Sequence, residues 1–338
     1  MSTHPIRKIG NVDVSAIGYG CMGLSTSYGP HGSDEERLKF LDELYASGCR
    51  HWDTADAYGD SEELLGKWFK RTGKRADIFL ATKFGFKHTP DGLTINGSPE
   101  YVKQACSKSL ERLGVEYIDL YYIHRADKTV PIELTIGAVA ELVKEGKVKQ
   151  IGISEVSEAT LRRAHAVHPI AAIQVEYSPF CLDIESPSIG LLKASRELGI
   201  AIVAYSPLGR GLLTGRYKGP EDFAEDDGRR RLPRFSAANF PLINKIVDSI
   251  NAIGVKHGAT SGQVALAWLL EQGDDIIPIP GTQNVKYLHE NLGALNVRLS
   301  PNEIKEVRAL AESADFEGDR YPALFASFVL VDTPPLEG

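Results

Sequence analysis

The chain has 338 residues, of which 43% are hydrophobic and 25% are charged, and its formal net charge is −7. This composition is ordinary for a soluble globular protein, and the acidic balance argues against a nucleic-acid partner, which normally requires a basic surface. No apolar run approaches the roughly 20 residues of a membrane span, and the first residues contain no apolar signal core. We therefore expect a cytoplasmic protein with no membrane contact.

The cysteines stand far apart in the sequence, at Cys21, Cys49, Cys106 and Cys181. None of them is part of the CxxC spacing that suggests zinc or redox chemistry. We expect reduced, mostly buried thiols, as is usual in a reducing compartment, and no metal site.

Short apolar runs alternate along the chain with longer segments of helical periodicity. The runs carry apolar residues on both faces, which is typical of parallel strands that are covered on both sides. The predicted strands are residues 16–20, 50–54, 78–83, 118–124, 148–154, 172–176, 201–205 and 276–279.

The gaps between these strands carry helix start and stop signals. Ser33 is a predicted N-cap followed by three acidic residues, and this helix ends near Gly48, where glycine can take the left-handed cap. Another helix follows Ser98 and stops at Gly114. Further helices are predicted at residues 131–145, 158–167, 188–198, 239–256, 261–271 and 285–292, and Ser300 with Pro301 opens a last one.

Eight strands that are each followed by a helix predict an α/β fold, the (β/α)8 TIM barrel, with an extra C-terminal helix and long loops at the C-terminal face. A doubly wound sheet is the alternative. Residues 18–23 match its GxGxxG turn, but they lead into a loop rich in Gly, Pro and Ser instead of a helix. We expect a single domain over residues 1–338, in which residues 219–234 and the C-terminal tail (318–338) are loop-like.

Ionisable side chains close three neighbouring predicted strands, where a barrel collects its catalytic groups. Asp53, Lys83 and His124 stand at these strand ends, and Tyr58 lies five positions after Asp53. We expect the four side chains to converge at one mouth of the barrel.

This combination suits the reduction of a carbonyl group. The carbonyl oxygen needs a proton, which Tyr58 can supply, although a free phenol has a pKa of about 10. A nearby Lys83 ammonium is expected to lower that pKa, and Asp53 to keep the ammonium charged. His124 can donate a hydrogen bond that orients the carbonyl. The hydride must come from a cofactor, because no side chain carries one.

Several segments resemble the aldo-keto reductases, and the resemblance extends to about residue 295. It is carried by residues 52–59 (WDTADAYG), 80–83 (LATK), 119–124 (DLYYIH) and 146–154 (GKVKQIGIS). It implies a (β/α)8 barrel in which Tyr58 is the general acid, Lys83 and Asp53 tune it, and His124 orients the substrate. Residues 205–211 (YSPLGRG) are similar to the branch that holds pyridoxal reductases, plant and fungal aldehyde reductases and potassium-channel β subunits.

The same resemblance implies an NADP(H) site. Ser154 and Gln174 would bond the nicotinamide carboxamide, and Tyr205 would stack on the ring. The pyrophosphate would lie against Ser206, Leu208, Gly209 and Arg210, and the adenosine end against Gly281, Thr282, Gln283, Lys286, Glu290 and Asn291. One departure concerns the 2′-phosphate: the nearest basic residue is Lys286, with no arginine in the loop. We favour NADP(H), with NAD(H) as the alternative.

Four aromatic residues are predicted to line an apolar substrate pocket, although packing in the core would account for each of them equally well: Trp52, Phe86, Tyr28 and Phe180. The leading hypothesis is an oxidoreductase that reduces aldehydes or ketones to alcohols. The second hypothesis is a slow-turnover, nucleotide-sensing regulatory subunit. It is weakened because no part of the sequence looks like an inactivating N-terminal extension. The third is an aldolase that uses Lys83 as a Schiff base, which Asp53 disfavours by keeping the amine protonated.

Overall fold

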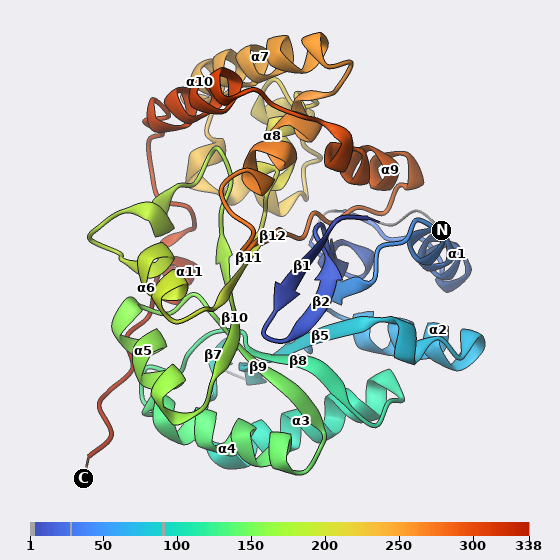
Figure 1. Ribbon diagram of the computed structural model, residues 1–338, viewed down its shortest axis with the longest axis vertical. Coiled ribbons are helices and arrows are strands. Elements are labelled where there is room, and N and C mark those ends of the chain that lie inside the picture. The colour runs from blue at the N-terminus through green and yellow to red at the C-terminus, as the bar shows by residue number, and fades with distance from the viewer. Residues whose placement is uncertain (1–3, 28, 90–91, 338) are drawn as a thin grey trace.

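Eight short strands run parallel to one another in one sheet, in the order in which they occur along the chain. The computed structural model describes residues 4–27, 29–89 and 92–337 (Figure 1). These strands correspond one by one to the predicted runs. They are β3 (Tyr19–Gly20), β4 (His51–Asp53), β5 (Phe79–Phe84), β8 (Ile118–Ile123), β9 (Val148–Ser154), β10 (Ile170–Glu176), β11 (Ala201–Tyr205) and β12 (Ile276–Pro278).

Backbone hydrogen bonds link the first strand of the sheet to the last. The Gly18 amide donates to the Pro278 carbonyl at 2.9 Å, and the Gly20 amide donates to the Pro280 carbonyl at 3.5 Å. A β-carbon on Gly20 would lie 2.9 Å from the carbonyl oxygen of Ile279, so this close approach of the two backbones requires a glycine. Gly20 is the second glycine of the GxGxxG pattern at residues 18–23. The sheet is therefore closed into a (β/α)8 barrel, as predicted.

A helix follows each barrel strand and covers the outside of the barrel (Figure 1). These helices are α1 (Asp34–Ala46), α2 (Ser61–Thr72), α3 (Pro99–Leu113), α4 (Ile132–Lys144), α5 (Glu158–Val167), α6 (Leu191–Glu197), α8 (Ser261–Leu270) and α9 (Val285–Gly293). Three more are α7 (Phe240–Lys256), which precedes α8, α10 (Pro301–Glu312), and α11 (Ala323–Ala326) in the C-terminal tail.

The predicted caps lie where the sequence placed them. Ser33 and Glu36 form a reciprocal capping box at the start of α1, and the Ser98 side chain accepts from the Tyr101 amide at the start of α3. Helix α6 is shorter than the predicted 188–198 because Gly190 takes a left-handed φ of 68° before the helix begins. Residues 219–234 form one-turn 3-10 helices, η5 (Pro220–Asp222), η6 (Gly228–Arg231) and η7 (Pro233–Phe235), where a loop was expected.

Two antiparallel hairpins were not predicted. Strands β1 (Ile6–Ile9) and β2 (Val12–Ser15) pair across a Gly-Asn turn, a two-residue hairpin signal that the sequence does contain. Ile9 and Val14 of this hairpin are buried against residues of the barrel interior such as Ala81 and Leu120, so it closes the end of the barrel opposite the strand ends that carry the site (Figure 1). Strands β6 (Phe86–Thr89) and β7 (Gly92–Ile95) form the second hairpin.

The main hydrophobic core lies between the sheet and the surrounding helices, with Trp52, Trp68 and Trp268 among its largest fully buried side chains. All four cysteines are buried and free. Within the described residues, the helices lack the combination of length and apolarity that crossing a membrane would require.

Candidate active site

The predicted tetrad is brought together at one end of the barrel. Asp53 is the last residue of β4, Lys83 is the second-to-last residue of β5, and His124 follows β8 directly. Parallel pairing aligns Asp53 with Ala81 and Lys83 with Tyr122 on the neighbouring strands, so these strand ends share one edge. Tyr58 reaches the same place from the turn between β4 and α2, where its amide donates to the Ala55 carbonyl at 3.1 Å.

The Lys83 ammonium is the centre of this arrangement. It donates to a carboxylate oxygen of Asp53 and, at 2.8 Å, to the Thr54 carbonyl, and it lies 3.5 Å from the Tyr58 hydroxyl. Lys83 is fully buried, and burial alone would lower the pKa of its amine. The contacts with Asp53 and Tyr58 outweigh burial, so the pKa of Lys83 is raised and the ammonium stays charged.

The Tyr58 phenol differs from the expectation in one respect. Lys83 was expected to lower its pKa, and the ammonium does act in that direction. Burial acts more strongly, because it penalises the charged phenolate, and the pKa of Tyr58 is raised above its ordinary value. The phenol therefore keeps its proton at neutral pH.

The His124 ring packs edge-on against two aromatic rings, with its centroid 5.5 Å from that of Tyr58 and 4.8 Å from that of Phe86. Burial, together with the positive charges of Lys83 and Arg125, holds the pKa of His124 well below its usual range. The imidazole is thus neutral at pH 7. Its Nδ1 atom is buried and has no hydrogen-bond partner in the part of the chain that the structure describes.

Ser154 and Gln174, expected at the nicotinamide carboxamide, face the same end of the barrel from β9 and β10, where they pair in register. The Gln174 amide donates to Asp53 at 2.8 Å, and the Ser154 hydroxyl accepts from Arg125 at 3.1 Å. Both side chains are buried polar groups next to the tetrad. They fit an amide ligand, because each can donate and accept hydrogen bonds.

The segment after β11 bends sharply at the positions expected to bind the pyrophosphate. Ser206, Gly209, Arg210 and Gly211 all take positive φ angles, of 49°, 55°, 54° and 99°. Such left-handed turns gather backbone amides into concavities that suit anions. The Arg210 guanidinium pairs with Glu176 at 2.9 Å, and Leu208 lies within this bend, directly before the 3-10 helix that begins at Gly209. This donor set fits a pyrophosphate.

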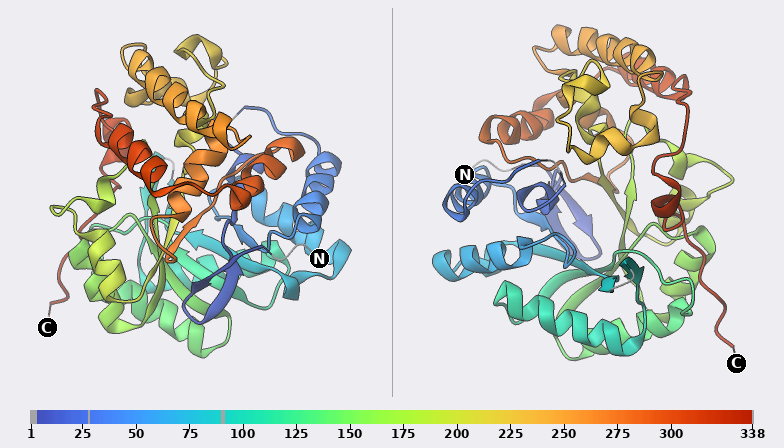
Figure 2. Two further views of the ribbon diagram at one scale, coloured as in Figure 1. Left: turned by 45° about the horizontal axis from the view of Figure 1, so that its top comes forward. Right: turned by 180° about the vertical axis from the view of Figure 1, so that it is seen from behind.

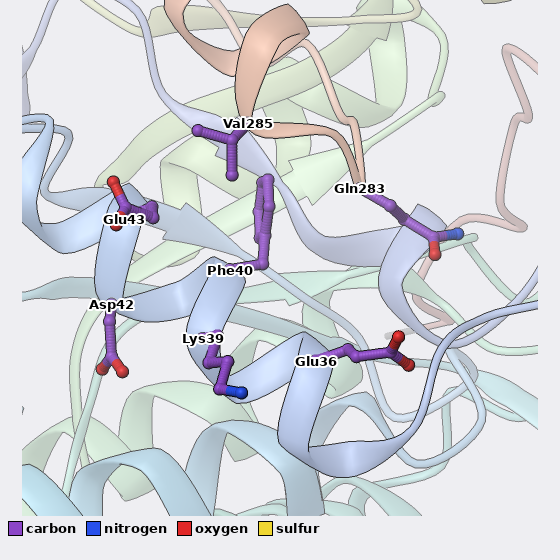
Figure 3. Close-up of a pocket in the computed structure, with 7 residues that line it drawn as sticks. All are labelled: Glu36, Lys39, Phe40, Asp42, Glu43, Gln283 and Val285. Atoms are coloured by element: carbon purple, nitrogen blue, oxygen red, sulfur yellow. The ribbon is translucent and has the colours of Figure 1, made fainter.

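The residues expected at the adenosine end follow β12. The Gly281–Thr282 backbone lies beside β3, where the Tyr19 hydroxyl donates to the Thr282 carbonyl at 2.5 Å. Gln283 donates to the Gly23 carbonyl, Lys286 is exposed in the first turn of α9, and Glu290 and Asn291 lie on that helix. A groove of about 390 Å³ adjoins this region between α1 and α9 (Figure 3). It is lined by Glu36, Lys39, Phe40, Asp42, Glu43, Gln283 and Val285.

Comparison with known proteins places this geometry in a family. The model of the aldo/keto reductase family matches residues 16–312. The chain belongs to the aldo-keto reductase family.

Relatives of this aldo-keto reductase match over almost its whole length. It is 59% identical over 337 residues to aldo-keto reductase str7 of Strobilurus tenacellus, and 51% identical over 336 residues to aldo-keto reductase yakc of Schizosaccharomyces pombe, whose name specifies NADP(+). Each match covers 98% of both chains. Among solved structures, the glycerol dehydrogenase AKR11B4 from Gluconobacter oxydans is similar with a TM-score of 0.83 and 25% identity, over 92% of this chain and 96% of that one.

The aromatic residues expected to contact a substrate lie in different surroundings. Phe86, in β6, packs on His124 and stays a candidate. Trp52 is completely buried, its ring lies tilted against that of Trp68 with the centroids 4.7 Å apart, and its indole donates to the Cys49 carbonyl. Successive residues of a strand face opposite sides, so Trp52 points to the outer helices because Asp53 points inward, and core packing is its role. Tyr28 lies outside the described residues.

Several charged residues near the reductase site were missed by the sequence analysis. Glu155 is fully buried directly after Ser154, and Arg125 directly follows His124. Both are charges that close an apolar run, the same signal that identified the tetrad. Arg320 of the C-terminal tail is buried against Glu155, which lies 165 positions away in the sequence. No local sequence pattern predicts this contact.

Proposed function

We propose that the protein reduces aldehydes or ketones to alcohols with NADP(H), and that Tyr58 donates the proton to the carbonyl oxygen. The Lys83 ammonium carries this proposal, because it touches Asp53 on one side and lies 3.5 Å from the Tyr58 hydroxyl on the other. A phenol beside a buried ammonium–carboxylate pair is suited to general acid catalysis, which typically contributes about 10²–10⁴-fold.

The proton transfer follows from the charges around Tyr58. Burial keeps its pKa above the ordinary value, so the phenol arrives protonated. When the proton leaves, the fixed Lys83 ammonium stabilises the phenolate without moving, because Asp53 and the Thr54 carbonyl already hold it. A preorganised charge of this kind acts strongly in a site from which water is excluded.

His124 is proposed to orient the carbonyl group. Its imidazole is neutral and its ring is held between Tyr58 and Phe86. A neutral N–H donor can bond the carbonyl oxygen without adding a second positive charge beside Lys83. The Phe86 ring next to it offers apolar surface to the substrate.

NADP(H) is the proposed cofactor, and when bound it supplies the hydride. Ser154 and Gln174 are assigned to the carboxamide, Tyr205 to the ring face, and Arg210 with the left-handed turn to the pyrophosphate. The phosphorylated form is supported by the NADP(+) in the name of the Schizosaccharomyces pombe relative. We assign Gly281, Thr282, Gln283, Lys286, Glu290 and Asn291 to the adenosine end.

The aldolase alternative is disfavoured by the state of Lys83. A Schiff base requires a neutral amine, whereas Asp53 raises the pKa of this lysine and keeps it charged. The regulatory-subunit alternative predicts slow turnover, so rapid oxidation of NADPH over a panel of aldehydes and ketones separates it from the reductase.

The proton donor is tested with Tyr58→Phe. We expect kcat for a small aromatic aldehyde to fall by about 10²–10⁴-fold, because the substitution removes the hydroxyl that is proposed to donate the proton. The Kd for NADPH, measured by fluorescence, should stay within about threefold. Tyr45→Phe is the matched control, because it removes a hydroxyl that bonds Asp77 at the surface. Full activity in the Tyr58 variant would contradict the assignment.

A further inference from the structure

A buried charge cluster joins the C-terminal tail to the barrel face where the nicotinamide ring is proposed to lie. Its centre is the Arg320 guanidinium, whose side chain is only 8% exposed. It contacts three carboxylates from three different segments: Glu155 at 3.3 Å, Asp183 at 3.1 Å and Glu176 at 3.6 Å. Arginine has the planar, multiply donating group that such an arrangement requires.

Glu155 is the most constrained of these carboxylates. It is fully buried, and its backbone takes a positive φ of 51°, which costs energy for a residue other than glycine. Its carboxylate accepts from the Tyr205 hydroxyl at 2.8 Å and from the Glu176 amide at 3.1 Å. Burial alone would raise the pKa of Glu155, but Arg320 and Arg125 outweigh it and the carboxylate is ionised.

The tail also touches the proposed cofactor residues directly. The hydroxyl groups of Tyr205 and Tyr321 lie 3.0 Å apart, and the Arg210 guanidinium lies over the Tyr321 ring at 4.8 Å. Further along, the Val331 amide donates to the Glu155 carbonyl at 3.1 Å. The tail therefore crosses the ends of β9 and β11. The right-hand view of Figure 2, which shows the molecule of Figure 1 from behind, shows the tail running along the barrel.

We propose that Arg320 is a positioning residue of the cofactor site: by holding the Glu155 carboxylate it fixes the Tyr205 phenol, and with it the surface that receives the nicotinamide ring. This inference rests on the proposed function. Without Arg320, Glu155 is a buried carboxylate that has lost its nearest cation, so it must take up a proton or move. In either case Tyr205 loses a fixed hydrogen-bond acceptor.

NADPH binding, measured by fluorescence titration, tests this without requiring turnover. We expect Arg320→Met to raise the Kd for NADPH by about tenfold. In steady state the KM for NADPH should rise in parallel, while kcat at saturating NADPH stays within about threefold, because the Tyr58–Lys83 contact is untouched. Arg320→Lys should restore part of the affinity.

A double-mutant cycle asks whether Arg320 acts through Glu155. Glu155→Gln keeps the size and the acceptor oxygen but removes the charge. In that background, adding Arg320→Met should change the Kd by less than about twofold. Fully additive effects would show that Arg320 acts by another route and would overturn the proposal.

Arg163→Met is the matched control for general loosening of the tail. Arg163 holds the far end of the tail through the carbonyls of Thr333 and Pro334 and does not touch Glu155. We expect its NADPH affinity to stay within about twofold of wild type. An equal loss of affinity in this variant, or unchanged or tighter binding in Arg320→Met, would overturn the role of Arg320. A wild-type protein that binds no NADPH would overturn the proposed function together with this inference.

Discussion

Asp56 is a titratable group beside the tetrad that the proposed chemistry does not use. It is half-buried, its amide donates to the Lys83 carbonyl at 3.0 Å, and its Oδ1 atom has no partner among the described residues. Burial and the neighbouring Glu62 raise the pKa of Asp56 to about 7, against the opposing charges of Arg112 and Lys83. The folded protein therefore holds this carboxyl protonated well above the pH at which the unfolded chain releases the proton.

This shift has a definite sign for stability. Between about pH 4 and about pH 7 the folded state binds more protons than the unfolded state, so the contribution of Asp56 falls as the pH rises. We expect Asp56→Asn, which cannot ionise, to gain about 4 kcal/mol relative to wild type between about pH 4 and about pH 8, since the pKa is raised from 3.8 to about 7. Urea unfolding across this range measures it. A difference for Asp56→Asn that stays flat across this range would contradict the assigned pKa.

At the scale of elements, the start of α9 is the segment that we propose to receive the adenosine end of the cofactor. The helix begins at Val285, capped by Asn284, whose side chain accepts from the Lys286 amide at 2.9 Å. A helix N-terminus favours an anion, but the adjacent groove carries the carboxylates of Glu36, Asp42 and Glu43 (Figure 3). Lys286 is the basic residue of this first turn, so the proposed preference for a 2′-phosphate depends on it.

We expect Lys286→Met to weaken NADPH binding by about 3–10-fold and NADH binding by less than about twofold, because only NADPH carries the additional phosphate. Parallel fluorescence titrations with both nucleotides measure the two effects. Lys305→Met removes an equivalent exposed charge on α10 and should leave both affinities unchanged. Equal losses for NADPH and NADH would place Lys286 away from the 2′-phosphate.

At the scale of the whole molecule, closure of the barrel depends on two glycines, Gly20 and Gly281, whose backbones lie close together because neither carries a side chain. A β-carbon on Gly281 would lie 2.6 Å from the carbonyl oxygen of Gly20, a distance that requires one strand end to shift. The hairpin β1–β2 fills the opposite end of the barrel with Ile9 and Val14. We infer that the barrel and the tail form one domain, because the Arg320 cluster ties the tail to the residue after β9, to the end of β10 and to the connection that follows β10.

Gly281→Ala should therefore destabilise the cofactor-free protein by about 1–3 kcal/mol, the usual cost of overpacking. Thermal unfolding gives the comparison. Gly137→Ala in α4 is the matched control, since a β-carbon there meets no atom within 4 Å, and alanine favours a helix by about 1 kcal/mol over glycine. A Gly281 variant as stable as wild type would mean that the strand ends separate freely.

Local chemistry in the sequence was enough for the barrel and the tetrad. Apolar runs of strand length, caps such as Ser33 and Ser98, and ionisable residues at consecutive strand ends all act through near neighbours in the chain. In parallel strands these local signals also fix a common edge, so the convergence of Asp53, Lys83 and His124 followed from topology alone.

Only the tertiary structure decided which side of a strand a residue faces, and which distant charges meet. Trp52 and Asp53 are neighbours in the sequence, yet one is core and the other lines the site. The pKa of Tyr58 is raised because burial of the phenol has a larger effect than its attraction to Lys83. The spacing of residues along the sequence does not show how deeply a side chain is buried. The pairing of Glu155 with Arg320 joins positions far apart in the chain, so it exists only once the barrel has closed and the tail has crossed it.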